Sequence, residues 1–278
     1  MIKKFLTIMI ALSAAFFVGC EDDDPILIDM APAAPQGVYS VTGDHEVYIY
    51  WYGPYESDIE GYIIWRSFEP IHNYQQVGYV DAVSNPNLDL LIYEYIDRAV
   101  VNGATYYYAV SSVDKAGQVS ELSAENVFDT PRPDGAVTLA DSGSIMNQSG
   151  YNFAAQAVVS ATSEVADVFI DMFDGIFYLN ARDIFTDIQD MGYTESFDDI
   201  GWAPPDGWSE VGWMEIIQDH TYVIWTRDNH FAKLRVESIN SITVDFLWAY
   251  QTVDGLQELK PVVMEKPVHG PEYLIKSF

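Results

Sequence analysis

Residues 36–130 contain short stretches in which apolar and polar positions alternate, with turn residues between the stretches. Val47, Ile49 and Trp51 are separated from one another by single tyrosines, and this period of two is typical of a β-strand. Similar strands are expected at four further places: 61–66, 76–80, 91–96 and 106–113. Strands at this spacing, with Gly, Pro, Asn and Asp between them, predict an all-β sandwich.

The same pattern returns after residues 130–135, whose two prolines make a stiff linker. The stretch 165–179 contains two apolar segments around Asp174-Gly175, a turn dipeptide that predicts a β-hairpin. Three more strands are expected, at 221–226, 231–236 and 242–250. The fold class is therefore predicted to be all-β, with a second β-rich domain after the first sandwich.

One short helix is expected in this second part, around residues 181–191. Ile184, Phe185 and Ile188 lie there at positions i, i+1 and i+4, a spacing that places them on one face of a helix. Such a helix would be short and packed on the surface of the sheets.

Motifs at the strand ends make residues 36–130 resemble a fibronectin type III domain. In chain order these motifs are Ala34-Pro35, Trp51, Gly61-Tyr62 and the runs 102–106, 113–117 and 120–123. The resemblance implies a sandwich in which Trp51 packs between two sheets and Tyr62 lies at the start of the third strand. It also implies that Tyr106 forms a tyrosine corner, with its hydroxyl bonded to backbone upstream. Because this fold hosts spacers, adhesion modules and receptor parts alike, a rigid spacer is the expected role.

The first twenty residues have the pattern of a targeting signal with a membrane anchor. Lys3 and Lys4 precede an apolar stretch, residues 5–18, that is too short to cross a membrane and fits a signal peptide. The run Phe17-Val18-Gly19-Cys20 resembles the lipobox of bacterial lipoproteins. That resemblance implies cleavage before Cys20 and a diacylglyceryl thioether on its sulfur, with N-acylation completing a stable anchor.

An acidic tether follows the anchor. The run Glu21-Asp22-Asp23-Asp24 is self-repelling, and it resembles the export signals of surface-exposed lipoproteins, so an outer-membrane location facing outward is expected. The chain is thus predicted to have four parts: a signal peptide with lipobox at 1–20, the tether at 21–35, the fibronectin type III domain at 36–130, and a second β-rich domain with a Trp-rich loop at 131–278.

The composition narrows the choice of partners. The 278 residues include 13 Lys and Arg against 42 Asp and Glu, a formal net charge of -29. This charge excludes nucleic acid as a partner, because phosphate binding needs a basic surface. The expected partners are the membrane, through Cys20, and a protein or glycan at the cell surface. Since Cys20 is the sole cysteine, no intrachain disulfide is expected.

Three tryptophans gather in residues 201–213, where Pro and Gly exclude a regular helix or a central strand. Trp202, Trp208 and Trp213 are the candidate ligand-binding residues, because exposed aromatic faces stack on sugars and other planar groups. The alternative is that this loop folds back over the sheet as a lid. The sequence leaves both alternatives open.

A fainter similarity concerns haem. Residues 222–236, together with 168–174 and Leu179-Asn180, resemble the HmuY-like haem-binding surface lipoproteins, which implies histidine ligands from loops. His220 and His230 stand at the two ends of a predicted strand, roughly 25–30 Å apart if that strand is extended. Both cannot reach one iron, so haem capture is kept as an alternative and no cofactor is expected.

Known catalytic motifs are missing from the sequence. It contains no H-E-x-x-H, no G-x-S-x-G, no phosphate-binding glycine loop and no Cys-type zinc site. Asp58 and Glu60 are close in sequence, but two carboxylates without a cage are expected to be solvated, so no metal site is predicted. We therefore expect a lipid-anchored cell-surface binding or scaffolding protein without catalytic residues. The alternatives are capture of haem or a glycan by the C-terminal domain, and hydrolysis of a surface polymer.

Overall fold

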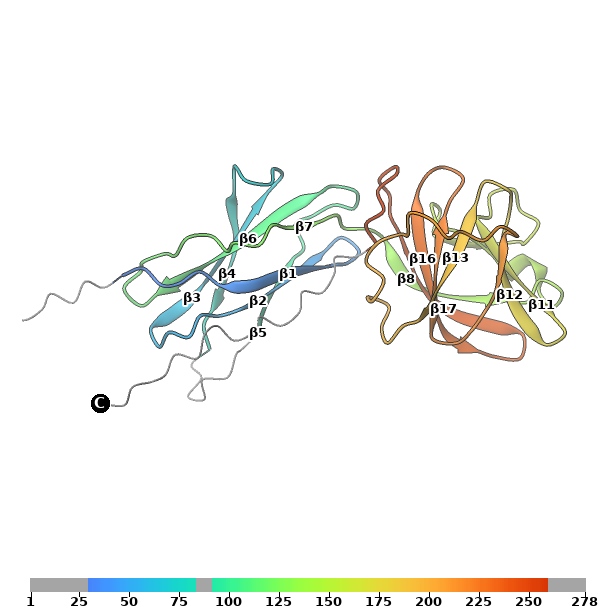
Figure 1. Ribbon diagram of the computed structural model, residues 1–278, viewed down its shortest axis with the longest axis horizontal. Helices are drawn as coiled ribbons and strands as arrows, with labels where there is room; N and C mark the ends of the chain where they lie inside the picture. The colour runs from blue at the N-terminus through green and yellow to red at the C-terminus, as the bar shows by residue number, and fades with distance from the viewer. Residues whose placement is uncertain (1–29, 84–91, 260–278) are drawn as a thin grey trace, which may run out of the picture. The chain divides into compact units, whose positions relative to one another are not determined.

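A computed structural model describes residues 30–83 and 92–259 of the chain (Figure 1). Every element below lies within the unit Ala31–Phe278. The described residues form strands and a single 3-10 turn, with no α-helix among them, so the predicted all-β class is confirmed. No helix in this part of the chain is long and apolar enough to span a membrane. The lipobox with Cys20 and the tether run 21–24 lie outside the described residues.

The first sandwich has seven strands in two antiparallel sheets, ordered β1-β2-β5 and β4-β3-β6-β7. The strands are β1 (Gln36–Thr42), β2 (Val47–Tyr52), β3 (Ile59–Ser67), β4 (Gln75–Asp81), β5 (Ile92–Asp97), β6 (Tyr106–Asp114) and β7 (Val127–Asp129). Three strands thus face four, in a fibronectin type III-like sandwich. All of the strands expected between residues 36 and 114 are present, and their observed bounds differ from the expected ones by a few residues at most.

The core of this sandwich is built around aromatic side chains. Trp51 is fully buried, and its ring meets Tyr62 edge-on at 5.5 Å and stacks on Tyr93 at 5.9 Å, between centroids. The hydroxyl of Tyr106 accepts a hydrogen bond from the backbone N–H of Val101, five residues upstream, at 3.1 Å. That bond fixes the segment before β6, which is the function of a tyrosine corner.

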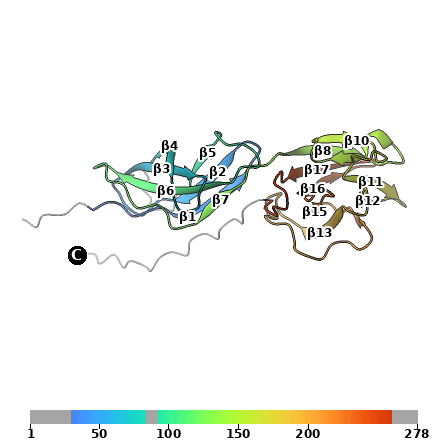
Figure 2. The same cartoon turned by 90° about the horizontal axis from the view of Figure 1, so that it is seen from above.

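The second sandwich has two antiparallel five-stranded sheets (Figures 1 and 2). The sheet ordered β10-β9-β11-β12-β14 contains β9 (Gly150–Asn152), β10 (Ala157–Val159), β11 (Val168–Phe173), β12 (Ile176–Ala181) and β14 (Trp213–Glu215). The sheet ordered β13-β15-β16-β17-β8 contains β8 (Asp134–Ala140), β13 (Asp187–Tyr193), β15 (His220–Trp225), β16 (Phe231–Ile239) and β17 (Thr243–Tyr250). The 3-10 turn η1 (Met146–Gln148) precedes β9. We call the sheet with β9–β12 and β14 the open sheet, and the sheet with β8, β13 and β15–β17 the covered sheet. The names refer to their outer faces.

Alternation of side chains explains the core between these sheets. Ile170 and Leu179 point inward from the open sheet, while Leu234 and Phe246 point inward from the covered sheet, and all four are buried. The hairpin expected at Asp174-Gly175 joins β11 to β12, and both turn residues have positive φ, 51° and 81°. A two-residue turn with positive φ at both positions matches the twist of the flanking strands.

The prediction of a helix around residues 181–191 is wrong. β12 ends at Ala181, a turn follows, and β13 pairs with β15 from Asp187 onward. Ile184 and Phe185 are 88% and 70% exposed at this turn, while Ile188 alone is buried in the core. The Asp183 carboxylate accepts a hydrogen bond from the Phe185 N–H at 2.9 Å, a local turn contact that competes with helix formation.

Candidate functional site

The two sheets of the second sandwich differ in their outer faces. On the covered sheet, the outward side chains of Val223, Phe231 and Lys233 are buried. Together with Ala203 and Leu259, which lie outside the sheet, Val223 and Phe231 form a second, small apolar cluster. The long connection between β13 and β14 therefore forms a lid over this face.

Lys233 of the covered sheet donates hydrogen bonds to the lid. Its side chain is 0% exposed, and Nζ donates hydrogen bonds to the carbonyl oxygens of Phe197 at 2.6 Å and Ile200 at 3.2 Å. The ammonium also lies 4.0 Å from the centroid of the Phe197 ring, within range of a cation–π interaction. One buried cation thus gathers two backbone carbonyls and an aromatic ring from the lid.

Arg235, two residues further along β16, holds the beginning of the lid. Its guanidinium donates to the Thr194 hydroxyl from Nε at 3.2 Å and to the Thr194 carbonyl from Nη2 at 3.0 Å. It also pairs with Asp219 at 3.1 Å and with Glu237. These contacts satisfy a guanidinium that the lid buries almost completely.

The three candidate tryptophans do not form one site. The Trp208 ring packs from the lid onto the covered sheet, 5.9 Å from the Trp225 ring and 6.4 Å from the Phe231 ring between centroids. Trp202 is 42% exposed, and its backbone forms an isolated bridge with Glu258. Trp213 is 47% exposed and begins β14, in the open sheet. The loop is thus a lid at Trp208, while Trp213 belongs to a different surface.

That surface is the outer face of the open sheet. The strand registers place its side chains in three rows: Phe169, Asn180 and Trp213; Asp171, Tyr178 and Glu215; Phe173 and Ile176. We call these eight side chains the aromatic face. The inward neighbours on the same strands fill the core, so this face is turned outward, and none of its eight side chains is buried.

Three aromatic rings cross the aromatic face on a diagonal. Trp213 lies on β14, Tyr178 on β12 in the next row, and Phe173 on β11 in the row after that. The Trp213 and Tyr178 rings touch edge to face, with centroids 5.3 Å apart and planes at 87°. Phe173 is 75% exposed, beside the hairpin turn. The face therefore offers a line of accessible aromatic surface and not a single ring.

Polar groups flank this diagonal. Asp171 and Glu215 lie on either side of Tyr178 in the middle row. The Asn180 amide donates to Asp171 Oδ1 at 2.8 Å, which orients both side chains. None of the eight side chains is Lys or Arg, so this face combines aromatic rings with hydrogen-bond acceptors and negative charge.

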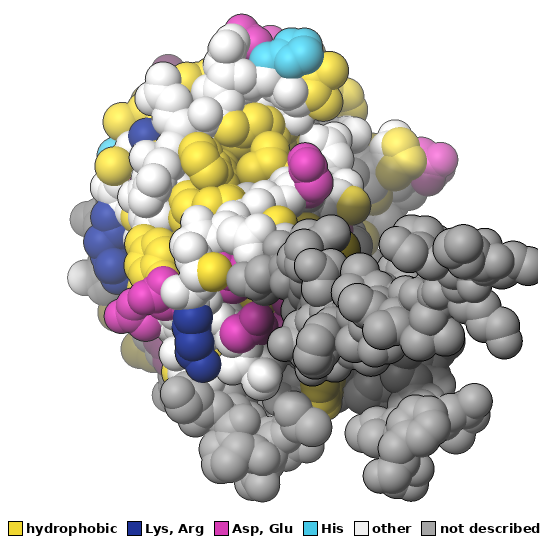
Figure 3. All heavy atoms as spheres, turned by 90° about the vertical axis from the view of Figure 1, so that its left-hand side faces the viewer, with side chains coloured by type: hydrophobic (Ala, Val, Ile, Leu, Met, Phe, Trp, Pro, Cys, Tyr) yellow, Lys and Arg dark blue, Asp and Glu magenta, His cyan; other side chains and the backbone are white. Residues whose placement is uncertain are grey.

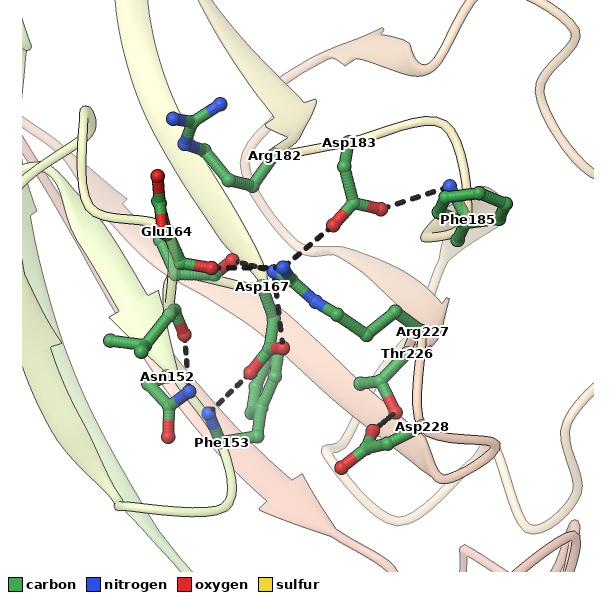
Figure 4. Close-up of polar contacts among 12 residues, drawn as sticks. Asn152, Phe153, Glu164, Asp167, Arg182, Asp183, Phe185, Thr226, Arg227 and Asp228 are labelled. Atoms are coloured by element: carbon green, nitrogen blue, oxygen red, sulfur yellow. Dashed lines mark hydrogen bonds and ion pairs between the residues drawn. The ribbon is translucent and has the colours of Figure 1, made fainter.

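A polar cluster centred on Arg227 holds the ends of the strands that carry the face (Figure 4). Arg227 comes from the turn between β15 and β16, and its Nη1 pairs with Asp183 at 2.8 Å and donates to the Glu164 carbonyl at 2.9 Å. Nη2 donates to the Ala166 carbonyl and lies 3.9 Å from Asp167. One arginine of the covered sheet thereby ties down the loop before β11 and the turn after β12.

Asp167 is the buried member of this cluster. It accepts a hydrogen bond from the Phe153 N–H at 2.8 Å, which opposes the effect of burial. Burial is the larger influence and raises the pKa of Asp167 to about 6. At neutral pH the carboxylate is therefore mostly ionised and faces the Arg227 guanidinium (Figure 4).

A second tie joins the open sheet to the covered sheet. The Tyr222 hydroxyl, on β15, accepts a hydrogen bond from the Ile217 N–H at 2.9 Å and donates one to the Glu215 carbonyl at 2.6 Å. The five-residue offset between Ile217 and Tyr222 equals that between Val101 and Tyr106 in the first sandwich. The end of β14, with Glu215, is held in place by this bond.

We expect Arg227→Gln to lower the free energy of unfolding of the second sandwich by about 2 kcal/mol. The substitution leaves Asp183 and two backbone carbonyls without their charged donor, and partly buried charge-assisted hydrogen bonds are worth about that much. Urea denaturation followed by tryptophan fluorescence measures it. Arg98→Gln is the control, because Arg98 is an exposed partner of Glu46 in the first sandwich and its loss should cost well under 1 kcal/mol. Equal effects of the two substitutions would contradict the role given to Arg227.

The two described histidines of the second sandwich lie at opposite ends of β15, while His269 lies outside the described residues. His220 begins the strand, and its Nδ1 lies 3.0 Å from the Asp190 carboxylate. His230 follows the turn after the strand, with Nδ1 3.2 Å from the Gln251 carbonyl. They do not form a pair of axial ligands for one iron. Within residues 30–83 and 92–259, no group of three His, Cys, Asp or Glu side chains is placed to hold a metal ion.

Comparisons with known proteins concern the fold. No protein-family model matches the chain, and no curated protein matches it. An Fn3-like protein from Clostridium thermocellum is 22% identical with a TM-score of 0.28, over 38% of this chain and 100% of that one. A DUF4466 family protein from Parabacteroides merdae is 12% identical with a TM-score of 0.41, and the match covers 79% of this chain and 94% of that one. The FN1–FN3 domains of chicken CNTN1 are 12% identical with a TM-score of 0.31, and the match covers 78% of this chain and 66% of that one.

Proposed function

We propose that this protein is a lipid-anchored binding or scaffolding protein of the bacterial cell surface. The observation that carries the binding function is the aromatic face, where aromatic rings stay exposed on the open sheet although the lid buries the equivalent face of the covered sheet. Exposed aromatic clusters on a soluble sandwich are typical of interaction surfaces. The stability of the domain does not depend on this face, because its core lies between the two sheets.

Support for the anchor comes from the sequence. A short apolar stretch after Lys3 and Lys4 ends at Gly19-Cys20, and an acidic run follows directly. Acylation of Cys20 would hold the chain at a membrane, and the acidic run would keep the folded part away from anionic lipid. In this proposal the tether places the sandwiches at the outer surface of the outer membrane.

The first sandwich is proposed to act as a spacer. Figure 3 shows the side of it that faces left in Figure 1, where charged side chains stand in small groups among apolar and uncharged ones. The described residues of this side form no single broad charged patch (Figure 3), so the view offers no strongly electrostatic docking site. A compact core around Trp51 suits a rigid element between the tether and the second sandwich.

The anchor is tested by metabolic labelling of the full-length protein in a Gram-negative host with an alkyne analogue of palmitate. We expect the protein to be labelled and to partition with membranes, and we expect Cys20→Ser to abolish both. Because Cys20 is the sole cysteine, thioether-linked label has no second site in the chain. Protease treatment of intact cells then tests orientation. Label that persists in Cys20→Ser, or full protection of the protein on intact cells, would overturn the corresponding part of the proposal.

A further inference from the structure

We propose that the aromatic face binds an extended chain of a neutral glycan, lying along the diagonal from Trp213 to Phe173. This inference rests on the proposed binding function and specifies its ligand. It assigns the binding to the open sheet, and it assigns the rest of the Trp-rich loop, with Trp208, to the closed lid on the other side of the sandwich.

The length of the diagonal favours a chain over a single ring. Trp213 and Phe173 are separated by two strand spacings and by two rows of two residues each. With about 4.8 Å between strands and about 3.4 Å per residue, their backbones lie roughly 17 Å apart. Tyr178 stands between them, and its ring lies at 87° to that of Trp213, so a ligand that contacts all three rings must be elongated and carry apolar patches along its length. A chain of pyranose rings has this property, because the C–H groups on each ring face pack against aromatic surfaces.

The polar groups on the face suit hydroxyl groups as partners. Asp171 and Glu215 flank the central ring, and a carboxylate accepts hydrogen bonds without donating any. Asn180 donates to Asp171 Oδ1, and Asp171 Oδ2 has no hydrogen bond to the described residues. Sugar hydroxyls can donate to these oxygens at either edge of a stacked ring. Aromatic rings beneath a sugar and carboxylate acceptors beside it complement its C–H and O–H groups.

Charge on the face selects a neutral glycan over an anionic one. Asp171 and Glu215 are the only charged side chains among the eight. The nearest arginine in sequence, Arg182, directs its guanidinium elsewhere, with hydrogen bonds to the carbonyls of Ser163 at 3.0 Å and Thr162 at 3.1 Å. No described cation on the face would therefore neutralise a uronate or a sulfate, and the whole chain carries a net charge of -29.

The same charges argue against a second copy of this chain as the occupant. A symmetric dimer through the aromatic face would bring the Asp171 and Glu215 carboxylates of two copies together. It would also bury the Asp171–Asn180 pair, whose remaining polar atoms would need new partners. A neutral, hydroxyl-rich chain meets neither cost.

Affinity electrophoresis of the full-length protein tests this proposal. The protein is kept in a detergent without a sugar headgroup and run through native gels that contain hydroxyethyl cellulose, xylan, laminarin or anionic polygalacturonate. We expect at least one neutral polysaccharide to retard the protein and polygalacturonate to leave it unretarded. Trp213→Ala and Phe173→Ala should each raise the apparent Kd about tenfold. Both residues are exposed, so neither substitution should change the urea midpoint appreciably.

Two matched variants control for the loss of an aromatic ring. Trp202→Ala and Phe185→Ala remove exposed rings of the second sandwich that do not lie on the aromatic face, and both should keep wild-type retardation. The proposal is overturned if no neutral gel retards the folded protein. It is also overturned if retardation survives in the Trp213→Ala/Phe173→Ala double variant, or if the control variants lose retardation equally. Concentration-dependent self-association that is lost in Trp213→Ala would identify a second copy as the occupant and overturn it as well. In each case, labelling at Cys20 tests the anchor independently.

Discussion

Replacement of Lys233 by Met is expected to lower the free energy of unfolding of the second sandwich by about 3 kcal/mol. Met keeps most of the apolar stem, so the change removes the ammonium group and little packing. The lid carbonyls of Phe197 and Ile200 then lose their donor, and unsatisfied buried acceptors cost about 1–3 kcal/mol each. The contact with the Phe197 ring is lost as well.

A readout specific to the lid separates this effect from general destabilisation. The Trp208 ring packs from the lid against Trp225 and Phe231, so a loosened lid should make tryptophan fluorescence more accessible to acrylamide below the unfolding transition. Lys115→Met is the control, because Lys115 is exposed in the first sandwich and donates to the Ser57 carbonyl. A Lys233→Met protein with an unchanged urea midpoint and unchanged quenching would show that the lid does not depend on this cation.

Sequence patterns predicted the first sandwich well because its strands obey a strict alternation. In β2, Val47, Ile49 and Trp51 are all fully buried while Tyr48 and Tyr50 are not. The hydroxyl of Tyr106 also bonds upstream backbone, at Val101, as the fibronectin type III resemblance implies. Period two, clear turns and a recognisable set of motifs all point to one arrangement there, and such agreement between levels is what makes a fold readable.

In the second sandwich the sequence predicted five of the ten strands, while β8, β9, β10, β13 and β14 were not expected. β15, β16 and β17 were expected within a few residues, and so was the β11–β12 hairpin. The helix prediction for residues 181–191 failed because two of its three apolar residues, Ile184 and Phe185, are exposed in a turn. Spacing over a single turn of helix carries little information when strand pairing can use the same residues.

The candidate site shows a different limit. Trp208 and Trp213 are five residues apart, yet one packs on the covered sheet and the other belongs to the open sheet, because β14 pairs with β12. Nearness in sequence therefore suggested a cluster that strand pairing separates. A usable signal existed in β11, where Phe169 and Phe173 occupy outward positions between the inward Val168 and Ile170 and the hairpin turn. Large apolar residues on both faces of one strand indicate that something covers the outer face or that it binds a ligand.

The buried cations were hidden for a related reason. Lys233 and Arg235 alternate with Ala232 and Leu234 in β16, and this alternation normally indicates a solvated outer face. Only the tertiary position of the 194–212 segment shows that both side chains are covered. Local patterns define which side of a strand is polar, but they do not show whether a distant loop lies over it.

Raising the pH from 5 to 9 is expected to destabilise the protein through two buried carboxyl groups. Burial raises the pKa of Glu258 to about 8 and that of Asp167 to about 6, from ordinary values of 4.5 and 3.8. A folded-state pKa above the unfolded one means that folding takes up a proton between the two values. The stabilising contribution is therefore complete below about pH 4 and is lost as the pH rises through about 6 for Asp167 and about 8 for Glu258. At about 1.4 kcal/mol per pKa unit, Glu258 accounts for roughly 3 to 5 kcal/mol.

Urea denaturation at pH 5, 7 and 9 measures this dependence, and substitutions separate it from the general repulsion of an acidic chain. Glu258→Gln should flatten the curve between pH 7 and 9, where Glu258 would otherwise lose its proton on the folded protein. Asp167→Asn should act mainly between pH 5 and 7. Glu121→Gln removes an exposed charge of the first sandwich and should shift the whole curve slightly without changing its shape. If Glu258→Gln has the same slope as the wild type above pH 7, another group governs stability there, and burial of Glu258 is not the cause.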